Sequence, residues 1–270
     1  MSIFAIKLFL RRLFHHAFKP SLFSLLRLTF LPRYRATSTT LFGKSVKLPD
    51  APSFLWMQDE IFMSEIYRFN TSSPRPLILD CGANIGLSVI YFKRLYSSAR
   101  VIAFEPDDQI FDTLSYNVGK FGFKDVELLK KGVWNEQTTL QFAAEGADGG
   151  RIAQENSSNM KKIETVRLRD YLDQPVALLK IDIEGAETAV LRDCADALGK
   201  VANIFVEYHS FDRDVQTLDE ILSILTRNGF RYYLDSAGMR SPHPFIYIKK
   251  NLNMDLQINI WGYRVDGKAQ

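Results

Sequence analysis

Cysteine and histidine are scarce in this chain. Its 270 residues include two cysteines, Cys81 and Cys194, and four histidines. The cysteines form no CxxC pair and have no histidine at a zinc-ligand spacing, so we expect both thiols to be reduced and structural. The few histidines also argue against a metal-dependent hydrolase, which would need more ligands than the chain offers.

Long apolar runs are missing as well. A membrane-spanning helix needs about 20 consecutive apolar residues, and basic residues interrupt every apolar stretch of residues 1–31. The same bases would break the apolar core of a secretory signal, and no small-residue cleavage site follows. We therefore expect a cytoplasmic protein with neither a membrane span nor a cleaved signal.

Acidic residues are absent from the first 49 positions, which hold nine Lys or Arg, whereas positions 50–270 hold 25 bases against 31 acids. Residues 1–35 can form an amphipathic helix with basic flanks. Such a helix suits the inner face of an anionic membrane, and it equally suits packing on the protein's own body or on a partner. Nucleic acid is not expected, because the bases alternate with Phe and Leu and match no binding module.

From about residue 76 the chain alternates β-rich runs with helical stretches, the pattern of a parallel sheet. Strands are expected at 77–81, 101–105, 126–130, 176–182, 203–209, 231–235 and 245–249, and helices at 87–96, 109–121, 188–198 and 215–228. The last two strands should pair antiparallel across a turn-rich loop. The sequence therefore predicts a Rossmann-like, doubly wound α/β fold with a mostly parallel seven-stranded sheet, a C-terminal antiparallel strand and an N-terminal helical extension.

The domain organisation follows from the same pattern. Residues 1–50 are expected to be a basic amphipathic extension, 51–250 the α/β domain, and 251–270 a C-terminal tail. The Gly- and Asn-rich stretch within residues 133–168 interrupts the alternation and predicts an inserted hairpin or flap.

A glycine turn follows the first predicted strand. In "DCGANIG" the glycines Gly82 and Gly86 are four apart, which is not the G-x-G-x-x-G pattern of a pyrophosphate site. Because Glu105 closes the next strand, it can accept both hydroxyls of a ribose. An adenosine ligand without phosphates fits, although Gly86 could serve only helix packing, and Asn84 or Glu105 could serve only as helix caps.

S-adenosylmethionine meets these needs. We expect Asp80 near its amino group, the glycine turn around its methionine part, Glu105 at the ribose, and the residues after the third strand beside the adenine. The predicted cofactor-binding residues are Asp80, Gly82, Ala83, Asn84, Gly86, Glu105, Pro106, Gly132 and Val133.

The stretch "LLKIDIEGAE" brings three acids to the end of a strand. A hydroxyl is a poor nucleophile at neutral pH and needs a base or a metal ion. Asp182 is the first candidate to orient or deprotonate it, Glu184 can share that role, and Glu187 is expected mainly as a helix-start residue.

The next strand ends in "VEYH", where His209 can supply a neutral imidazole and Glu207 can orient it or face the same cavity. The predicted catalytic residues are therefore Asp182, Glu184 and His209. A divalent metal ion on Asp182, Glu184 or Glu207 with His209 stays an open alternative, and no metal ligand is assigned.

Four motifs together resemble the FkbM-type methyltransferases of the class I fold: "LILDCGANIGLSVIYF", "VIAFEPDDQIFDTLSYN", "LLKIDIEGAETAVL" and "NIFVEYH". The resemblance covers about residues 55–250. It implies O-methylation of a hydroxyl by S-adenosylmethionine, often on a sugar of a glycolipid, a surface polysaccharide or a glycosylated natural product. Two positions depart from the family pattern, namely Cys81, where an aliphatic residue is usual, and Arg169, where an acid is frequent.

Two rival functions remain at this stage. A nicotinamide dehydrogenase is disfavoured by the glycine spacing. A non-catalytic, cofactor-binding accessory subunit at a membrane would carry the same motifs, because a fold and a cofactor pocket do not establish turnover.

Overall fold

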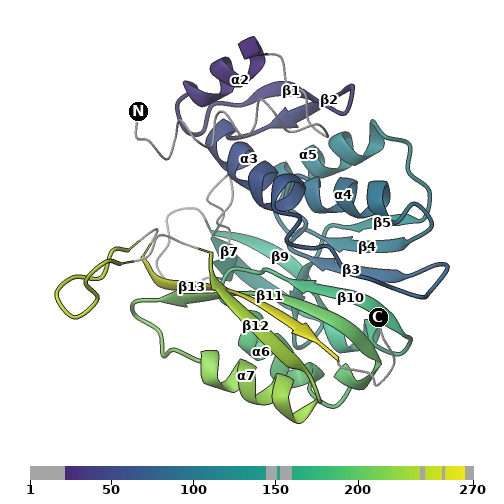
Figure 1. The fold of residues 1–270 in the computed structure, drawn as a ribbon, viewed down its shortest axis with the longest axis vertical. Helices are drawn as coiled ribbons and strands as arrows, with labels where there is room; N and C mark the ends of the chain where they lie inside the picture. Colours follow the sequence, from purple (N-terminus) through teal and green to yellow (C-terminus); the bar gives the residue numbers. More distant parts are fainter. Residues whose placement is uncertain (1–21, 144–150, 153–159, 238–240, 251–252, 265–270) are drawn as a thin grey trace.

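The computed structural model describes residues 22–143, 151–152, 160–237, 241–250 and 253–264 (Figure 1). The main sheet has seven strands in the order β12-β13-β11-β10-β3-β4-β5. Their bounds are β3 Leu77–Cys81, β4 Arg100–Phe104, β5 Val126–Leu129, β10 Val176–Ile181, β11 Val201–Phe211, β12 Arg231–Ser236 and β13 Met254–Tyr263. Strand β13 runs antiparallel to both of its neighbours, and the other pairs are parallel. The predicted doubly wound α/β fold is confirmed.

Apolar layers cover both faces of the sheet. Its central parallel strands β3 and β10 are therefore buried along their whole length. Helices α4 Leu87–Leu95 and α5 Asp108–Gly119 cover one face, and α6 Glu187–Cys194 and α7 Leu218–Arg227 cover the other (Figure 1). Successive residues of one strand enter different cores: Ile78 belongs to the core that contains Phe92, and Leu79 to the core that contains Leu191. Both cysteines are buried free thiols.

The strand order reverses between β3 and β10. From β3 the chain builds outward to β4 and β5, and it then returns to place β10 and β11 on the other side of β3. Ile181 pairs with Cys81, and the Asp182 amide donates to the Cys81 carbonyl at 3.1 Å. The loops that leave these two strands therefore lie side by side where doubly wound sheets bind ligands.

One predicted strand is wrong. Residues 245–249 form no strand, and Phe245 and Ile246 are fully or largely exposed. The antiparallel strand is β13, which falls within residues 251–270, so the expected C-terminal tail is in its described part a sheet strand. β13 takes this place because it buries Ile260 and packs Trp261 against Phe205, at 5.5 Å between ring centroids.

The described part of the N-terminal extension packs on the α/β domain. It comprises α2 Leu22–Thr29, β1 Thr37–Leu41 and β2 Lys44–Leu48, followed by α3 Ala51–Gln58 and the π-helical turn η1 Asp59–Met63. Leu25 and Leu48 are buried in the same core as Ile78, and the Lys47 amide donates to Asn117 on α5 at 2.7 Å. The apolar face of α2 thus serves the protein's own core, while residues 1–21 lie outside the described residues. Within the described residues, no helix combines the length and the apolar character that crossing a membrane requires.

The insertion between β5 and β10 forms a second, small sheet. Its strands are β6 Gly132–Trp134, β7 Thr139–Ala143, β8 Arg151–Ile152 and β9 Met160–Arg167, in the order β6-β9-β7-β8. β7 and β9 pair antiparallel. The short 3-10 helices η2 Leu168–Tyr171 and η3 Leu198–Lys200 precede β10 and β11.

Candidate active site

The turn after β3 lies tightly against its neighbours. The amides of Gly82 and Ala83 both donate to the carbonyl of Phe104, at 3.0 and 2.9 Å. Gly82 has φ +83°, and a Cβ there would lie 1.8 Å from the carbonyl oxygen of Asp182. Only glycine lets the two loops approach this closely. The next residue but one, Asn84, also has a positive φ, of 46°.

Glu105 closes β4 against this turn, as predicted. Its Oε2 accepts from the Asn84 amide and its Oε1 from the Asp107 amide, both at 3.0 Å. Burial raises the pKa of Glu105 to about 7, and the two amide donors oppose that rise. The alternative that Glu105 merely caps the next helix is wrong, because Asp107 is the N-cap and accepts from Gln109 and Ile110.

Asp80 is fully buried and faces inward. Its Oδ2 accepts from the Ser88 hydroxyl, and its Oδ1 lies 3.2 Å from Nζ of Lys180. The predicted contact of Asp80 with the amino group of the cofactor stays a prediction, since in this structure the carboxylate contacts protein groups.

Lys180 links the two loops. Its ammonium lies 3.3 Å from Oδ2 of Asp182 and donates to the Gly82 carbonyl at 2.7 Å, with a side chain only 3% exposed. Burial opposes the charge, but Asp80 and Asp182 outweigh it and raise the pKa of Lys180 well above its usual value. The sequence analysis missed this residue, because a lysine in a strand gives no sign that the strand is buried on both faces.

Pro106, Gly132 and Val133 lie beside Glu105 in the chain or the fold. A Cβ on Gly132 would lie 3.8 Å from Cβ of Pro106 and 2.9 Å from Ile163, so glycine fits this contact. Val133 is 4% exposed and belongs to the core that contains Phe104. Its predicted contact with an adenine stays a prediction.

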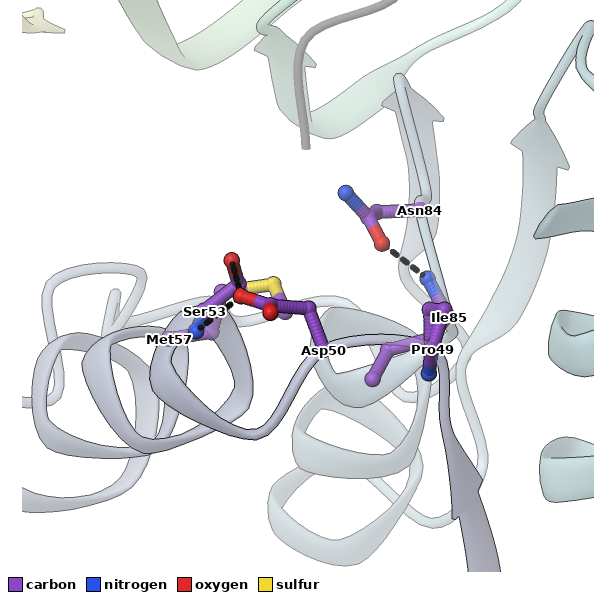
Figure 2. A pocket seen from close by; sticks show the side chains of 6 residues that line it. All are labelled: Pro49, Asp50, Ser53, Met57, Asn84 and Ile85. Atoms are coloured by element: carbon purple, nitrogen blue, oxygen red, sulfur yellow. Dashed lines mark hydrogen bonds between the residues drawn. The ribbon is translucent and has the colours of Figure 1, made fainter. Parts of the chain in front are cut away.

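A small hollow separates the glycine turn from α3 (Figure 2). Asn84 and Ile85 line it on one side, and residues of the segment 49–57 line it on the other. Asp50 caps α3 there by accepting from the Ser53 amide at 3.0 Å. The hollow encloses almost no space that a water-sized molecule could occupy, so by itself it is too small for S-adenosylmethionine.

The loop between β10 and α6, residues 182–186, is called the acid loop below and has an unusual backbone conformation. Glu184 has φ +57° and Gly185 has φ +99°. A positive φ at a glutamate is uncommon and is typical of functional sites. The Glu187 carboxylate, 1% exposed, folds the loop back by accepting from the amides of Ile183 and Gly185, at 3.2 and 3.0 Å.

Glu187 also holds His209, and this role was missed. Its Oε1 lies 3.0 Å from Nδ1 of His209, and both side chains are 1% exposed. Because this oxygen already accepts backbone N–H groups, Nδ1 is the donor. Nε2 then faces Glu184 and Glu207, each 3.7 Å away. The orienting role considered for Glu207 therefore belongs to Glu187, which is also the predicted helix-start residue, and Glu207 instead lies at the same cluster as Asp182 and His209, in agreement with the second alternative.

Buried acids crowd around this imidazole. Burial and the Asp182 charge raise the pKa of Glu207 to about 8, and burial raises that of Glu184 to about 8 against the opposing effect of His209. Burial disfavours a charged imidazole, but Glu184 and Glu187 outweigh it and raise the pKa of His209 well above its usual value. These surroundings therefore favour the protonated imidazole, whereas the sequence predicted a neutral one.

Glu60 is a further member of the site that sequence reasoning missed. It lies on the π-helical turn η1, and burial, with the Asp182 charge second, raises its pKa to about 7. π-helical turns are frequent at functional sites. The sequence around Glu60 matches no motif, so the sequence does not link it to Asp182. Only the fold brings the two carboxylates close enough to influence each other.

The fold and the site define a class. A glycine turn and an acid that closes the next strand meet a buried acid cluster at the reversal point of a doubly wound sheet, as in S-adenosylmethionine-dependent methyltransferases of class I. A family model described as "Methyltransferase FkbM domain" matches residues 80–232, more than half of the chain. The chain belongs to the FkbM methyltransferase family and is an S-adenosylmethionine-dependent methyltransferase.

Individual proteins agree with this assignment. The chain is 27% identical over 220 residues to Methyltransferase 1 of Beauveria bassiana, covering 72% of this chain and 87% of the relative. It is 31% identical over 186 residues to the methyltransferase sdnD of Sordaria araneosa, covering 55% and 72%. The crystal structure of the methyltransferase FkbM from Methylobacillus flagellatus superposes with a TM-score of 0.50 at 19% identity. That match covers 75% of this chain and 46% of the solved chain, and it supports the fold alone.

Proposed function

We propose that this protein transfers the methyl group of S-adenosylmethionine to a hydroxyl oxygen of a sugar in a glycolipid, a surface polysaccharide or a glycosylated natural product. The observation that carries the proposal is the position of Asp182. Its backbone touches the glycine turn, with the Gly82 Cβ position 1.8 Å from its carbonyl oxygen, while its side chain belongs to the acid cluster with Glu207 and His209. Asp182 thus connects the expected cofactor site to groups that can accept or donate a proton.

The proposed methyl transfer is a single in-line displacement at the methyl carbon. The acceptor oxygen attacks the methyl carbon, the carbon–sulfur bond breaks with its electron pair going to sulfur, and the hydroxyl proton goes to a base. Positioning contributes much of the rate in such an in-line transfer. We assign Asp182 to orient the hydroxyl and Glu184 to take the proton, because Glu184 and Glu187, against the effect of burial, raise the pKa of His209 well above its usual value and so make its imidazole a poor proton acceptor in the free protein.

Lys180 and Glu187 have supporting roles in this scheme. Lys180 fixes the Asp182 carboxylate from the side of the glycine turn. Glu187 fixes the acid loop and the imidazole together. Each carboxylate oxygen of Glu105 accepts one backbone amide, from Asn84 or Asp107, and keeps a further acceptor position for a ribose hydroxyl.

The names of further relatives favour oxygen and sugar acceptors. They include the 2-O-methyltransferase NoeI of Sinorhizobium fredii, 24% identical over half of this chain, and the 31-O-demethyl-FK506 methyltransferase of Streptomyces tacrolimicus, 25% identical over 70% of it. The hexuronic acid methyltransferase AglP of Haloferax volcanii is 29% identical over 50% of it.

The test is a search for the acceptor. Methyl-labelled S-adenosylmethionine and the full chain are incubated with glycolipid, polysaccharide and small-molecule fractions of a lysate, and mass analysis identifies what gains the labelled methyl group. We expect a methylated hydroxyl, with label lost in Asp182→Asn and kept in the exposed control Asp108→Asn. Cofactor binding without transfer to any fraction would instead support an accessory subunit, and transfer to nitrogen or carbon would refute O-methylation.

A further inference from the structure

The end of the sheet holds three side chains with the spacing of ligands around one ion. A carboxylate oxygen of Asp182, one of Glu207 and a ring nitrogen of His209 all lie within 4.8 Å of one another. Nε2 of His209 and Oε1 of Glu207 are 3.7 Å apart, too far for a hydrogen bond. Bonds of about 2.1 Å to a common ion place adjacent ligand atoms about 3 Å apart and opposite ones about 4.2 Å apart. If the three side chains moved slightly closer together, their ligand atoms would reach these separations.

The pose of His209 is the one that metal-ligating histidines adopt. Its Nδ1 donates to the buried carboxylate of Glu187 at 3.0 Å, which fixes the ring and directs Nε2 at the cluster. The Glu187 carboxylate bonded to Nδ1 makes the imidazole a stronger metal ligand through Nε2.

An unpartnered buried oxygen points to the same conclusion independently. Oδ1 of Asn259 has no hydrogen-bond partner among the described residues, and Asn259 is 4% exposed. Asn259 is the register partner of Glu207 across β11 and β13, so the two side chains share one face of the sheet. A buried carbonyl oxygen without a donor is costly, and a cation or a water molecule bound to one would satisfy it.

Gln257 lies at the same position. Its amide nitrogen donates to Glu207 and lies 3.3 Å from Nε2 of His209. Turning this amide group by 180° would direct its oxygen, in place of its nitrogen, toward Glu207 and His209, where it could bind a cation.

Lys180 does not already neutralise this cluster. Its ammonium contacts Asp80 and Oδ2 of Asp182. Across the parts of the chain that the structure describes, no lysine or arginine lies within ion-pair distance of Glu184 or Glu207; their ion-pair contacts are with His209, and a divalent cation bound to Nε2 would replace the proton on that imidazole. Asp182 also keeps its second oxygen, Oδ1, to offer.

We propose that Asp182, Glu207 and His209 bind one divalent cation, with the oxygens of Asn259 and Gln257 around it. One imidazole and two carboxylates suit Mn²⁺ better than the all-oxygen preference of Mg²⁺. The role of this ion rests on the proposed function: it holds the acceptor hydroxyl and lowers its pKa, and Glu184 receives the proton while the oxygen takes the methyl group from sulfur.

Binding is tested apart from activity. The full-length protein, freed of metal with a chelator, is titrated with Mn²⁺ while the signal of free Mn²⁺ is followed by electron paramagnetic resonance. We expect one ion per chain, with at least tenfold weaker binding in Glu207→Gln and in Asp182→Asn. The exposed control Glu127→Gln should bind as the wild type does, and melting curves show that each variant is folded.

The outcomes separate the site from its role. No Mn²⁺ binding at millimolar concentration, or equal affinity in folded Glu207→Gln, overturns the site whether or not methyl transfer occurs. Mn²⁺ binding with full methyl transfer after chelation leaves the site standing and overturns its catalytic role. Mn²⁺ binding in a protein that methylates no acceptor supports the site and counts against the proposed function.

Discussion

Gly82 offers the sharpest test of how the two loops fit together. In Gly82→Ala the new Cβ would lie 1.8 Å from the Asp182 carbonyl oxygen and 3.0 Å from its carbon, at φ +83°. Restoring ordinary contact requires a shift of more than 1 Å between two backbones that buried strands hold in place. The left-handed backbone costs about 1 kcal/mol for a residue with a Cβ, and overpacking in a close-packed interior adds about 1–3 kcal/mol.

The expected loss is therefore about 2–4 kcal/mol of the free energy of unfolding, or roughly 5–15 °C in Tm for a chain of this size. Because Asp182 moves with its backbone, a misplacement of about 1 Å should also lower turnover by about 100-fold. Thermal unfolding and methyl transfer are measured on the same preparations, together with calorimetry of S-adenosylmethionine binding.

Gly43→Ala is the matched control. Gly43 has φ +77°, but nothing lies within 4 Å of its Cβ position. This variant carries the backbone strain without the collision, so it should lose only about 1 kcal/mol and keep its turnover. If the two variants behave alike in stability and activity, the argued contact between the glycine turn and the acid loop is refuted.

Further predictions concern single residues. Glu105→Gln should weaken S-adenosylmethionine binding at least tenfold in calorimetry, and unchanged affinity would remove Glu105 from the ribose. Since Glu184 must be ionised to accept a proton and its pKa is raised to about 8, turnover of the wild type should rise with pH up to about 8; a flat profile would exclude Glu184 as the base. Glu187→Gln should lower turnover and shift that pH profile with cofactor affinity retained, because it frees His209; an unshifted profile would reduce Glu187 to a structural role. Deletion of residues 1–21 should reduce flotation with anionic liposomes if this segment contacts lipid, and equal recovery would end that idea.

The sheet was predictable because its strands alternate with helices in an unambiguous rhythm, and because the glycine turn marks the first strand end. The last strand was not. Residues 245–249 are apolar at nearly every position, as a buried strand would be, yet the chain uses residues 254–263, where Ile260 and Trp261 face opposite sides of the sheet. Local composition could not distinguish them, since pairing with β11 decides the matter.

The candidate site was predictable where a strand end carried it. Asp182 and Glu184 were candidates because they directly follow an apolar run, and His209 was a candidate because it comes late in the next strand; the structure brings the three side chains together. Glu187 was read as a helix-start residue, and nothing in the sequence shows that its carboxylate reaches an imidazole 22 positions away. Glu60 was missed for the same reason: it comes from another element and joins the site only through packing.

Asp182 and its neighbours are proposed to act on an acceptor beside bound S-adenosylmethionine. This role is tested by a single-turnover measurement with labelled cofactor and the identified acceptor, which compares the wild type with Asp182→Asn under saturating cofactor. In the variant we expect an affinity for S-adenosylmethionine within about threefold of the wild type and a methyl-transfer rate lower by about 100-fold or more, the size of a lost catalytic or positioning contact. Transfer at the wild-type rate in the variant would contradict this role of Asp182.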